Sequence, residues 1–283
     1  MKMIWLLLLV VAATFSGLRA WRALDHRSDL SAWQSLASRE AKELRLFDLA
    51  MVEDLPEPAR RYFAFTIAPG TPLHTVAEID MVGTLDNGSR EAPNPMPMEA
   101  KQILAPPFGL VWRVRFGKLS GSDGATPSTS WTRFWLLNTV PVVRASGPDH
   151  HRSSFGRVIA ETAFWSPASL LPGPGVRWEA VDRDRARAIV TYGSFQQAVE
   201  ITVDPEGAPT KVLIKRWSDA NTEGEFREQP FGGFLSEYRS FDGYRLPTRV
   251  EGGNLIGTPE YFAFFRAEVS DIRLGETSIR GTK

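Results

Sequence analysis

The chain has 283 residues, 43% of them hydrophobic, which is enough to form a domain with a full apolar core. Its 33 lysine and arginine residues equal its 33 aspartate and glutamate residues, which argues against the broad basic surface of a nucleic-acid-binding protein. The absence of cysteine excludes disulfides, thiolate metal sites and cysteine nucleophiles.

Residues 1–20 are predicted to be a membrane-directed segment. Residues 3–18 are uncharged and mostly apolar, and they directly follow Lys2. As a helix they span roughly 24 Å, which is short for a bilayer core of about 30 Å. The segment therefore predicts either a cleaved signal peptide or an uncleaved N-terminal anchor, so the membrane is an expected partner through this end. Both alternatives place the remaining chain outside the cytoplasm, in the periplasm or at the inner membrane.

Residues 21–68 are predicted to form an N-terminal helical region. Apolar residues recur at near-helical spacing across Ser28–Met51, with charged residues between them, which indicates an amphipathic helix. A second, short helix is predicted to start at Leu55, next to a proline suited to a first helical turn. An Ala-Pro-Gly sequence at 68–70 marks the clearest boundary.

Residues 69–283 are predicted to form an antiparallel β domain. Four segments alternate apolar and polar side chains with a period of two, as strands with one buried and one solvated face do: 73–85, 110–116, 199–203 and 244–251. Turn sequences separate these and similar runs, and we expect roughly ten to twelve strands. The Gly-, Ser- and Thr-rich stretch 118–130 is predicted to be a mobile loop.

One helix interrupts the β pattern. Residues 153–165 lose the period of two, and one more turn is predicted at 167–171 before a Pro-Gly-Pro-Gly sequence. A lone helix in a β meander has apolar surface to bury, and the open face of the sheet is the nearest place. The expected fold class is therefore mainly β (α+β): a large curved antiparallel sheet, or half-barrel, with an inserted helix near 153–171 and N-terminal helices.

The common catalytic motifs are missing from the sequence. We find no nucleophile elbow, phosphate-binding glycine loop, dinucleotide fingerprint or His-Glu-x-x-His motif. Adjacent His150 and His151 cannot easily share a metal on a strand or a helix, although they could form a loop site with Asp149. We therefore predict no cofactor and no metal, and we consider catalysis less well supported than binding.

Glu161 is the most informative single polar residue. It lies on the predicted inserted helix, so packing of that helix into the sheet would desolvate its carboxylate and require a partner. Arg113, Arg144 and Arg216 are on strand-like segments that could provide one. A solvated glutamate on the outer helix face is the equally weighted alternative.

Most of the nine tryptophans fall in the β domain, where core packing is the simplest explanation. The functional alternative is an aromatic pocket with one polar group, which suits a lipid or another apolar molecule. The residues predicted to bind this ligand are Trp112, Arg113, Trp135, Glu161, Trp165, Trp178, Arg216 and Trp217.

Several strings together resemble a bacterial family of unknown function with a membrane-directed N-terminus. They are LPEPARRY at 55–62, a strand ending near Gly83, Gly-Ser-Asp at 121–123 and ETAFWSPASLLP at 161–172. The resemblance extends over roughly 55–274, but residues 125–130 replace a glycine-rich aromatic segment that is usual in the family. The resemblance implies no activity. Its layout is similar to the periplasmic lipoprotein carriers, in which a curved antiparallel sheet holds helices over an apolar cavity.

Three functional hypotheses follow. The leading one is a non-enzymatic cell-envelope protein that binds an apolar or lipid-like ligand in a half-barrel cavity. The second is a hydrolase or isomerase that uses Glu161 with an arginine. The third is a structural partner of an envelope complex that docks through the Ser28–Met51 helix.

Overall fold

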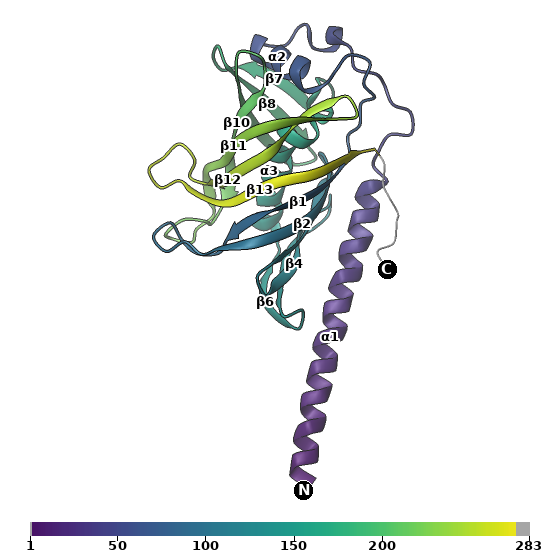
Figure 1. Cartoon of the computed structure of the whole chain (residues 1–283), viewed down its shortest axis with the longest axis vertical. Coiled ribbons are helices and arrows are strands. Elements are labelled where there is room, and N and C mark those ends of the chain that lie inside the picture. Colours follow the sequence, from purple (N-terminus) through teal and green to yellow (C-terminus); the bar gives the residue numbers. More distant parts are fainter. Residues whose placement is uncertain (1, 276–283) are drawn as a thin grey trace.

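The computed structural model describes residues 2–275, and one sheet of 13 antiparallel strands dominates it (Figure 1). The strands are β1 Ala77–Asp86, β2 Pro95–Ala105, β3 Gly109–Phe116, β4 Leu119–Ala125, β5 Ser130–Leu136, β6 Val140–Ala145, β7 Val176–Ala180, β8 Arg185–Tyr192, β9 Phe195–Val203, β10 Pro209–Ser218, β11 Arg227–Phe241, β12 Tyr244–Asn254 and β13 Phe262–Leu274. The helices are α1 Lys2–Ala37, α2 Glu57–Thr66 and α3 Pro148–Trp165, with 3₁₀ turns η1 Leu49–Val52 and η2 Pro167–Leu170.

The sheet consists of two meanders joined in its centre. Strands β1 to β6 pair in chain order, as do β7 to β13, and the pairing of β1 with β13 connects the two halves. The sheet is open, with β6 and β7 as its edge strands. Helix α3 lies between the two meanders in the sequence. It contacts strands of both halves: β2 to β5 in the first, and β9, β10 and β12 in the second. The sheet therefore curves around α3, and the predicted mainly β half-barrel with an inserted helix is confirmed.

The alternation along each strand decides which face a side chain occupies. In β3, Leu110, Trp112 and Val114 belong to the main core on the α3 side. Val111, between them, belongs to a smaller cluster with Leu36 of α1. Helices α3 and α1 therefore lie on opposite faces of the same strands, as the period of two requires.

Helix α1 is continuous from the apolar N-terminal stretch to Ala37. By length and composition it is able to cross a membrane, a property that signal sequences share, and its most apolar window is not buried. Its less exposed residues recur three or four positions apart, which makes one contact face of Leu18, Arg22, Asp25, Asp29, Trp33 and Leu36. The bare apolar part projects beyond the sheet (Figure 1).

The predicted helix over Ser28–Met51 is wrong in its second half, because α1 ends at Ala37. The following segment pairs with extended chain instead: the Phe47 N–H donates to the Thr71 carbonyl and the Gly70 N–H to the Phe47 carbonyl, both at 2.8 Å. The Glu40 carboxylate accepts from the Val76 N–H at 2.7 Å. Tertiary hydrogen bonds thus override the helical pattern here. The second predicted helix is present as α2.

The predicted loop over 118–130 is also wrong, because most of it is strand β4. A Cβ at Gly121 would lie 1.9 Å from the Arg133 carbonyl oxygen, and one at Gly124 would lie 2.4 Å from the Trp131 ring. The small residues of β4 therefore make room for the neighbouring strand and its indole, a role that composition alone does not distinguish from a loop. Helix α3 begins five residues before the predicted start, and η2 provides the predicted extra turn.

Candidate functional site: a cavity beneath helix α3

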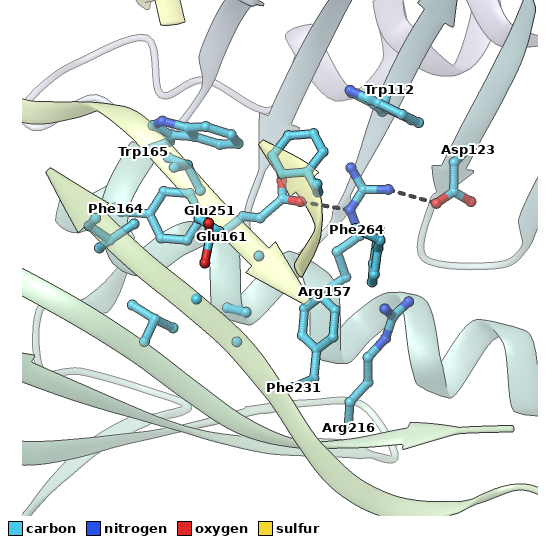
Figure 2. A pocket seen from close by; sticks show the side chains of 18 of the residues that line it. Trp112, Asp123, Arg157, Glu161, Phe164, Trp165, Arg216, Phe231, Glu251 and Phe264 are labelled. Atoms are coloured by element: carbon cyan, nitrogen blue, oxygen red, sulfur yellow. Dashed lines mark hydrogen bonds and ion pairs between the residues drawn. The ribbon is translucent and has the colours of Figure 1, made fainter. Parts of the chain in front are cut away.

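A cavity of about 280 Å³ lies between α3 and the concave face of the sheet (Figure 2). Most of its wall is apolar. The apolar lining residues are Leu85, Trp112, Phe134, Ala160, Phe164, Trp165, Val212, Phe231, Leu235, Val250, Phe264 and Phe265. Residues from both halves of the sheet contribute, so the cavity depends on the pairing that joins β1 to β13.

Glycines on β11 and β12 leave room at the cavity wall. Gly232, Gly233 and Gly252 line it, and Gly233 pairs with Gly252 across the two strands. At Gly233 a Cβ would lie 1.8 Å from the Glu251 carbonyl oxygen, so only glycine fits there. At Gly252 the nearest atom to a Cβ would be 3.8 Å away. A side chain at position 252 would therefore be sterically accepted and would occupy space at the cavity.

Polar side chains on α3 and the first half of the sheet form one network at the cavity. Arg157 donates from Nε to Glu161 Oε1 and from Nη1 to Asp123 Oδ2, both at 2.6 Å. Gln102 Nε2 donates to the other Glu161 oxygen at 2.6 Å. Burial opposes the charge of Arg157, but Glu161 and Asp123 outweigh it and raise its pKa. The guanidinium lies 5.2 Å from the centre of the Trp112 ring.

Arg216 enters the cavity wall from β10 without such a partner. Its Nε donates to the Ser153 hydroxyl at 3.1 Å, and its guanidinium lies 4.6 Å from the centre of the Phe231 ring. Among the described residues no carboxylate oxygen lies within 4.0 Å of its nitrogens, and Figure 2 shows dashed lines at Arg157 but none at Arg216. Burial, together with nearby Arg157, lowers the pKa of Arg216 to about 10, so it remains charged at neutral pH.

Two indole N–H groups at the cavity also lack acceptors. Trp112 and Trp165 are 5% and 1% exposed, and within residues 2–275 neither Nε1 has a hydrogen-bond partner. Buried donors normally find an acceptor, because leaving one unpaired costs about 1–3 kcal/mol. The site therefore combines an apolar wall with two buried indole donors that have no acceptor among the described residues.

Residues 45–267 match the model of a family of unknown function, DUF6544. The chain belongs to this family. The resemblance seen in the sequence is thereby confirmed, and the matched range includes every residue that lines the cavity but leaves out α1. No curated protein is significantly similar to the chain in sequence.

Three solved structures from bacteria have a similar fold. A domain named for outer membrane lipoprotein sorting, from Vibrio parahaemolyticus, has 13% identity and a TM-score of 0.40, covering 82% of this chain and 93% of its own. A LolA superfamily protein from Nitrosomonas europaea has 8% identity and a TM-score of 0.39, with 77% and 91% covered. A DUF1329 family protein from Desulfovibrio piger has 9% identity and a TM-score of 0.41, with 74% and 88% covered.

The structure brings four of the eight predicted ligand-binding residues together. Trp112, Glu161, Trp165 and Arg216 all line the cavity. The other four lie elsewhere. Two of the five tryptophans that were expected to line the pocket therefore do so.

Arg113 and Trp135 lie on the opposite face of the sheet, against α1. Arg113 follows Trp112 directly in β3, so the strand alternation turns it away from the cavity, and it contacts His26 at 3.3 Å. Trp135 donates to Asp25 Oδ2 at 3.0 Å. Arg144, another expected partner of Glu161, also binds Asp25 instead, at 2.5 Å.

Trp178 lies beside η2 and α2, and Trp217 lies beside the first turn of α3, so neither lines the cavity. Trp178 donates to the Leu170 carbonyl at 2.8 Å and packs against Phe63 of α2. Trp217 donates to Asp149 Oδ1 at 2.8 Å, and the Arg152 guanidinium lies 4.0 Å from the centre of its ring.

The sequence prediction did not include Arg157 as the partner of Glu161, although the sequence contains a signal for this pair. Arg157 stands four residues before Glu161, which is the spacing of an ion pair on one helix face. Asp123 was missed because its segment was interpreted as a loop, and Gln102 because nothing distinguishes one polar residue in a strand.

Asp149, His150 and His151 lie in the first turn of α3, not in a loop. His150 Nδ1 contacts the Ser130 hydroxyl at 2.7 Å, whereas His151 Nε2 contacts the Thr126 carbonyl at 2.9 Å. The two rings therefore have separate partners. Within residues 2–275 no group of three or more His, Asp or Glu side chains is arranged to hold a metal ion.

Proposed function

We propose that this protein binds an amphiphile with one apolar chain and an anionic head group in the cavity beneath α3, and that it does so in the cell envelope. The envelope location is supported by the apolar segment at 3–18 and by the membrane-crossing length of α1. The ligand is supported by the two kinds of surface that the cavity combines.

The wall supports binding of an apolar chain. Aromatic and aliphatic side chains from α3 and both halves of the sheet surround the space. Its volume of about 280 Å³ is near the lower end of the ~300–1,000 Å³ usual for ligand pockets, which favours a single chain over a multi-chain lipid.

Arg216 is the observation that supports the anionic head group. A guanidinium in a mostly apolar wall loses hydration. No described carboxylate lies within 4.0 Å of Arg216 to offset that loss, although Asp123, Glu161 and Asp219 attract its charge from farther away. A carboxylate or phosphate on the ligand would supply the missing charge through two parallel hydrogen bonds, which guanidinium geometry favours. The indole N–H groups of Trp112 and Trp165 add donors of the same polarity.

The alternatives receive less support. Both oxygens of Glu161 already accept hydrogen bonds, from Arg157 and Gln102, so this carboxylate is not positioned as a free acid or base. The face of α1 that would dock an envelope partner packs on the protein's own sheet through Trp33 and Leu36.

The test uses decanoate and decanol, which share a chain and differ in head-group charge. Full-length protein released from a nonionic detergent is titrated with each and analysed by native mass spectrometry. We expect wild type to bind decanoate more tightly than decanol. Gly252→Leu should weaken the binding of both amphiphiles at least tenfold, because the leucine side chain fills the cavity. Gly173→Leu is the control: this glycine is exposed, no atom lies within 4 Å of its Cβ position, and neither affinity should change.

Arg216→Met separates the head group from the chain. This substitution should weaken the binding of decanoate at least tenfold and leave the affinity for decanol within about threefold of wild type, because methionine keeps the apolar contact and removes the charge. Equal losses for both amphiphiles would contradict the head-group assignment. No bound mass with either amphiphile, and no co-purifying lipid on protein from membranes, would contradict binding itself.

A further inference from the structure

The end of the β5–β6 hairpin exposes apolar side chains to solvent. Leu137 is 67% exposed, Val140 and Val142 are 47% and Val143 is 43%. We call these four residues the apex. Strand β6 is an edge strand of the sheet, and exposed apolar edge strands promote association unless something covers them.

The backbone at the apex makes its leucine unusual. Leu137 and Asn138 have φ values of 50° and 56°, in the left-handed region that hairpin turns require. Asparagine and glycine adopt it readily, whereas a bulky apolar side chain does so at a cost. A strained leucine that is also exposed gains nothing from folding in water, so the turn points to a contact outside the chain.

Helix α1 shows which surface lies next to the apex. Arg144 of β6 binds Asp25 Oδ2 at 2.5 Å, and its guanidinium lies 4.5 Å from the centre of the Trp21 ring. Trp21 also packs edge-on against Trp135 of β5, with ring centres 5.5 Å apart. The hairpin is therefore attached to α1 within one turn of the apolar stretch 3–18.

The exposed part of α1 continues past the hairpin in the direction of its N-terminus (Figure 1). Residues 3–17 are all exposed, whereas contacts with the domain begin at Leu18. Trp21 is 45% exposed and lies where aromatic residues flank membrane-spanning helices. With residues 3–18 in a bilayer, the hairpin end is at the level of the head groups.

We propose that the apex is a membrane-contact surface, which rests on the bilayer that holds the apolar part of α1. Lys118, whose carbonyl accepts from the Leu137 N–H at 2.9 Å, places a basic residue beside the apex and favours anionic phospholipids. The two attachments, α1 and the apex, fix the orientation of the sheet relative to the membrane. This inference does not depend on a ligand in the cavity.

The native chain has no cysteine, so single cysteines report on single positions. Full-length Val142→Cys and Leu137→Cys proteins, labelled with an environment-sensitive fluorophore, are reconstituted into vesicles of phosphatidylcholine and phosphatidylglycerol that carry a head-group-level spin-label quencher. The control is Glu206→Cys, in the exposed β9–β10 turn beside α2, where Arg61 contacts Asp204. We expect blue-shifted, quenched emission at positions 137 and 142 and neither effect at 206.

A second variant tests the apex side chain without loss of folding. Leu137→Asn suits the turn, so it should keep or raise the melting temperature while it weakens quenching at position 142. Equal quenching at positions 142 and 206 would overturn the proposal, as would protection from solvent at 142 without lipid quenching, which would indicate a protein partner. A mature protein whose intact mass lacks residues 3–18 would overturn it as well.

Discussion

Arg157 and Glu161 lie one turn apart on α3 and form an ion pair in the concave face, with Nε and Oε1 separated by 2.6 Å. Through Gln102 on β2 and Asp123 on β4, this pair also attaches α3 to the first half of the sheet. The second half contacts α3 through apolar side chains and through polar contacts near the start of the helix, at Asp149, Arg152 and Ser153. Polar contacts therefore hold the helix to both halves, and the buried Arg157–Glu161 pair contributes those of the first half.

Glu161→Gln should lower the free energy of unfolding by about 2–3 kcal/mol, because it leaves the Arg157 charge poorly compensated away from water. Glu228→Gln is the matched control. It breaks a pair with Arg152 of similar length, 2.8 Å, whose side chains are 46% and 50% exposed, so it should cost less than ~1 kcal/mol. Urea unfolding followed by tryptophan fluorescence measures both, and equal costs would refute the structural role of the network.

Arg216→Met should raise the free energy of unfolding, by about 1 kcal/mol. The unpaired guanidinium loses hydration on folding, while the lost hydrogen bonds to Ser153 offset only part of the gain. Arg152→Met, at the surface pair with Glu228, should give no such increase. A loss of more than 1 kcal/mol in Arg216→Met would show that the charge serves stability and not binding.

The sequence predicted the β domain well because apolar and polar side chains alternate along several of its strands. In β9 and in the second half of β3 the alternation matches the burial of the side chains, and the inserted helix was visible as an interruption of the pattern. Strand β4 was hidden because its glycines make room for Trp131 and the Arg133 backbone on the next strand, and glycine content by itself favours a loop.

The candidate site was half predictable for the same reason. Residues on an identifiable face, such as Trp112 and Glu161, could be assigned to the interior. The prediction that Arg113 and Trp112 line the same pocket was wrong, because adjacent residues in a strand point to opposite faces of the sheet. Whether Trp135 faces α3 or α1 depends on which face each helix covers, and no local pattern carries that information.

Leu36→Ala should destabilise the protein by about 2–4 kcal/mol. Leu36 is 1% exposed and packs in the small cluster that joins α1 to the sheet, with Val111 and Trp131. Leu24→Ala, on the same helix at 61% exposure, should change stability by less than ~0.5 kcal/mol. Urea unfolding in detergent compares them. Indistinguishable values would mean that α1 does not dock as described.

Acidification from pH 7 to pH 5 should reduce stability, in part through His150. Burial lowers the pKa of this ring below its ordinary value, although the Asp123 carboxylate acts in the opposite direction. As pH falls through the ordinary value of ~6.5, the unfolded chain therefore takes up more protons at this position than the folded one, which favours unfolding.

His150→Gln should flatten the dependence of the unfolding free energy on pH between 5 and 7. A remaining slope is expected from His26, whose pKa is also lowered by burial, and His26→Gln in the same background should reduce it further. Unfolding measured in urea at several pH values checks the sign. An unchanged slope in both variants would contradict it.

The pairing of β1 with β13 has a consequence for biosynthesis. Ala77 pairs with Leu274, so the middle of the sheet is completed only when β13, the last of the described strands, has left the ribosome. Until then the two meanders are separate, and β1 and β12 expose unpaired backbone groups. A premature stop before residue 262 would leave both as unpaired edge strands, which promote aggregation. Such an architecture suits a polypeptide that is translocated unfolded and assembles only once its full length is available.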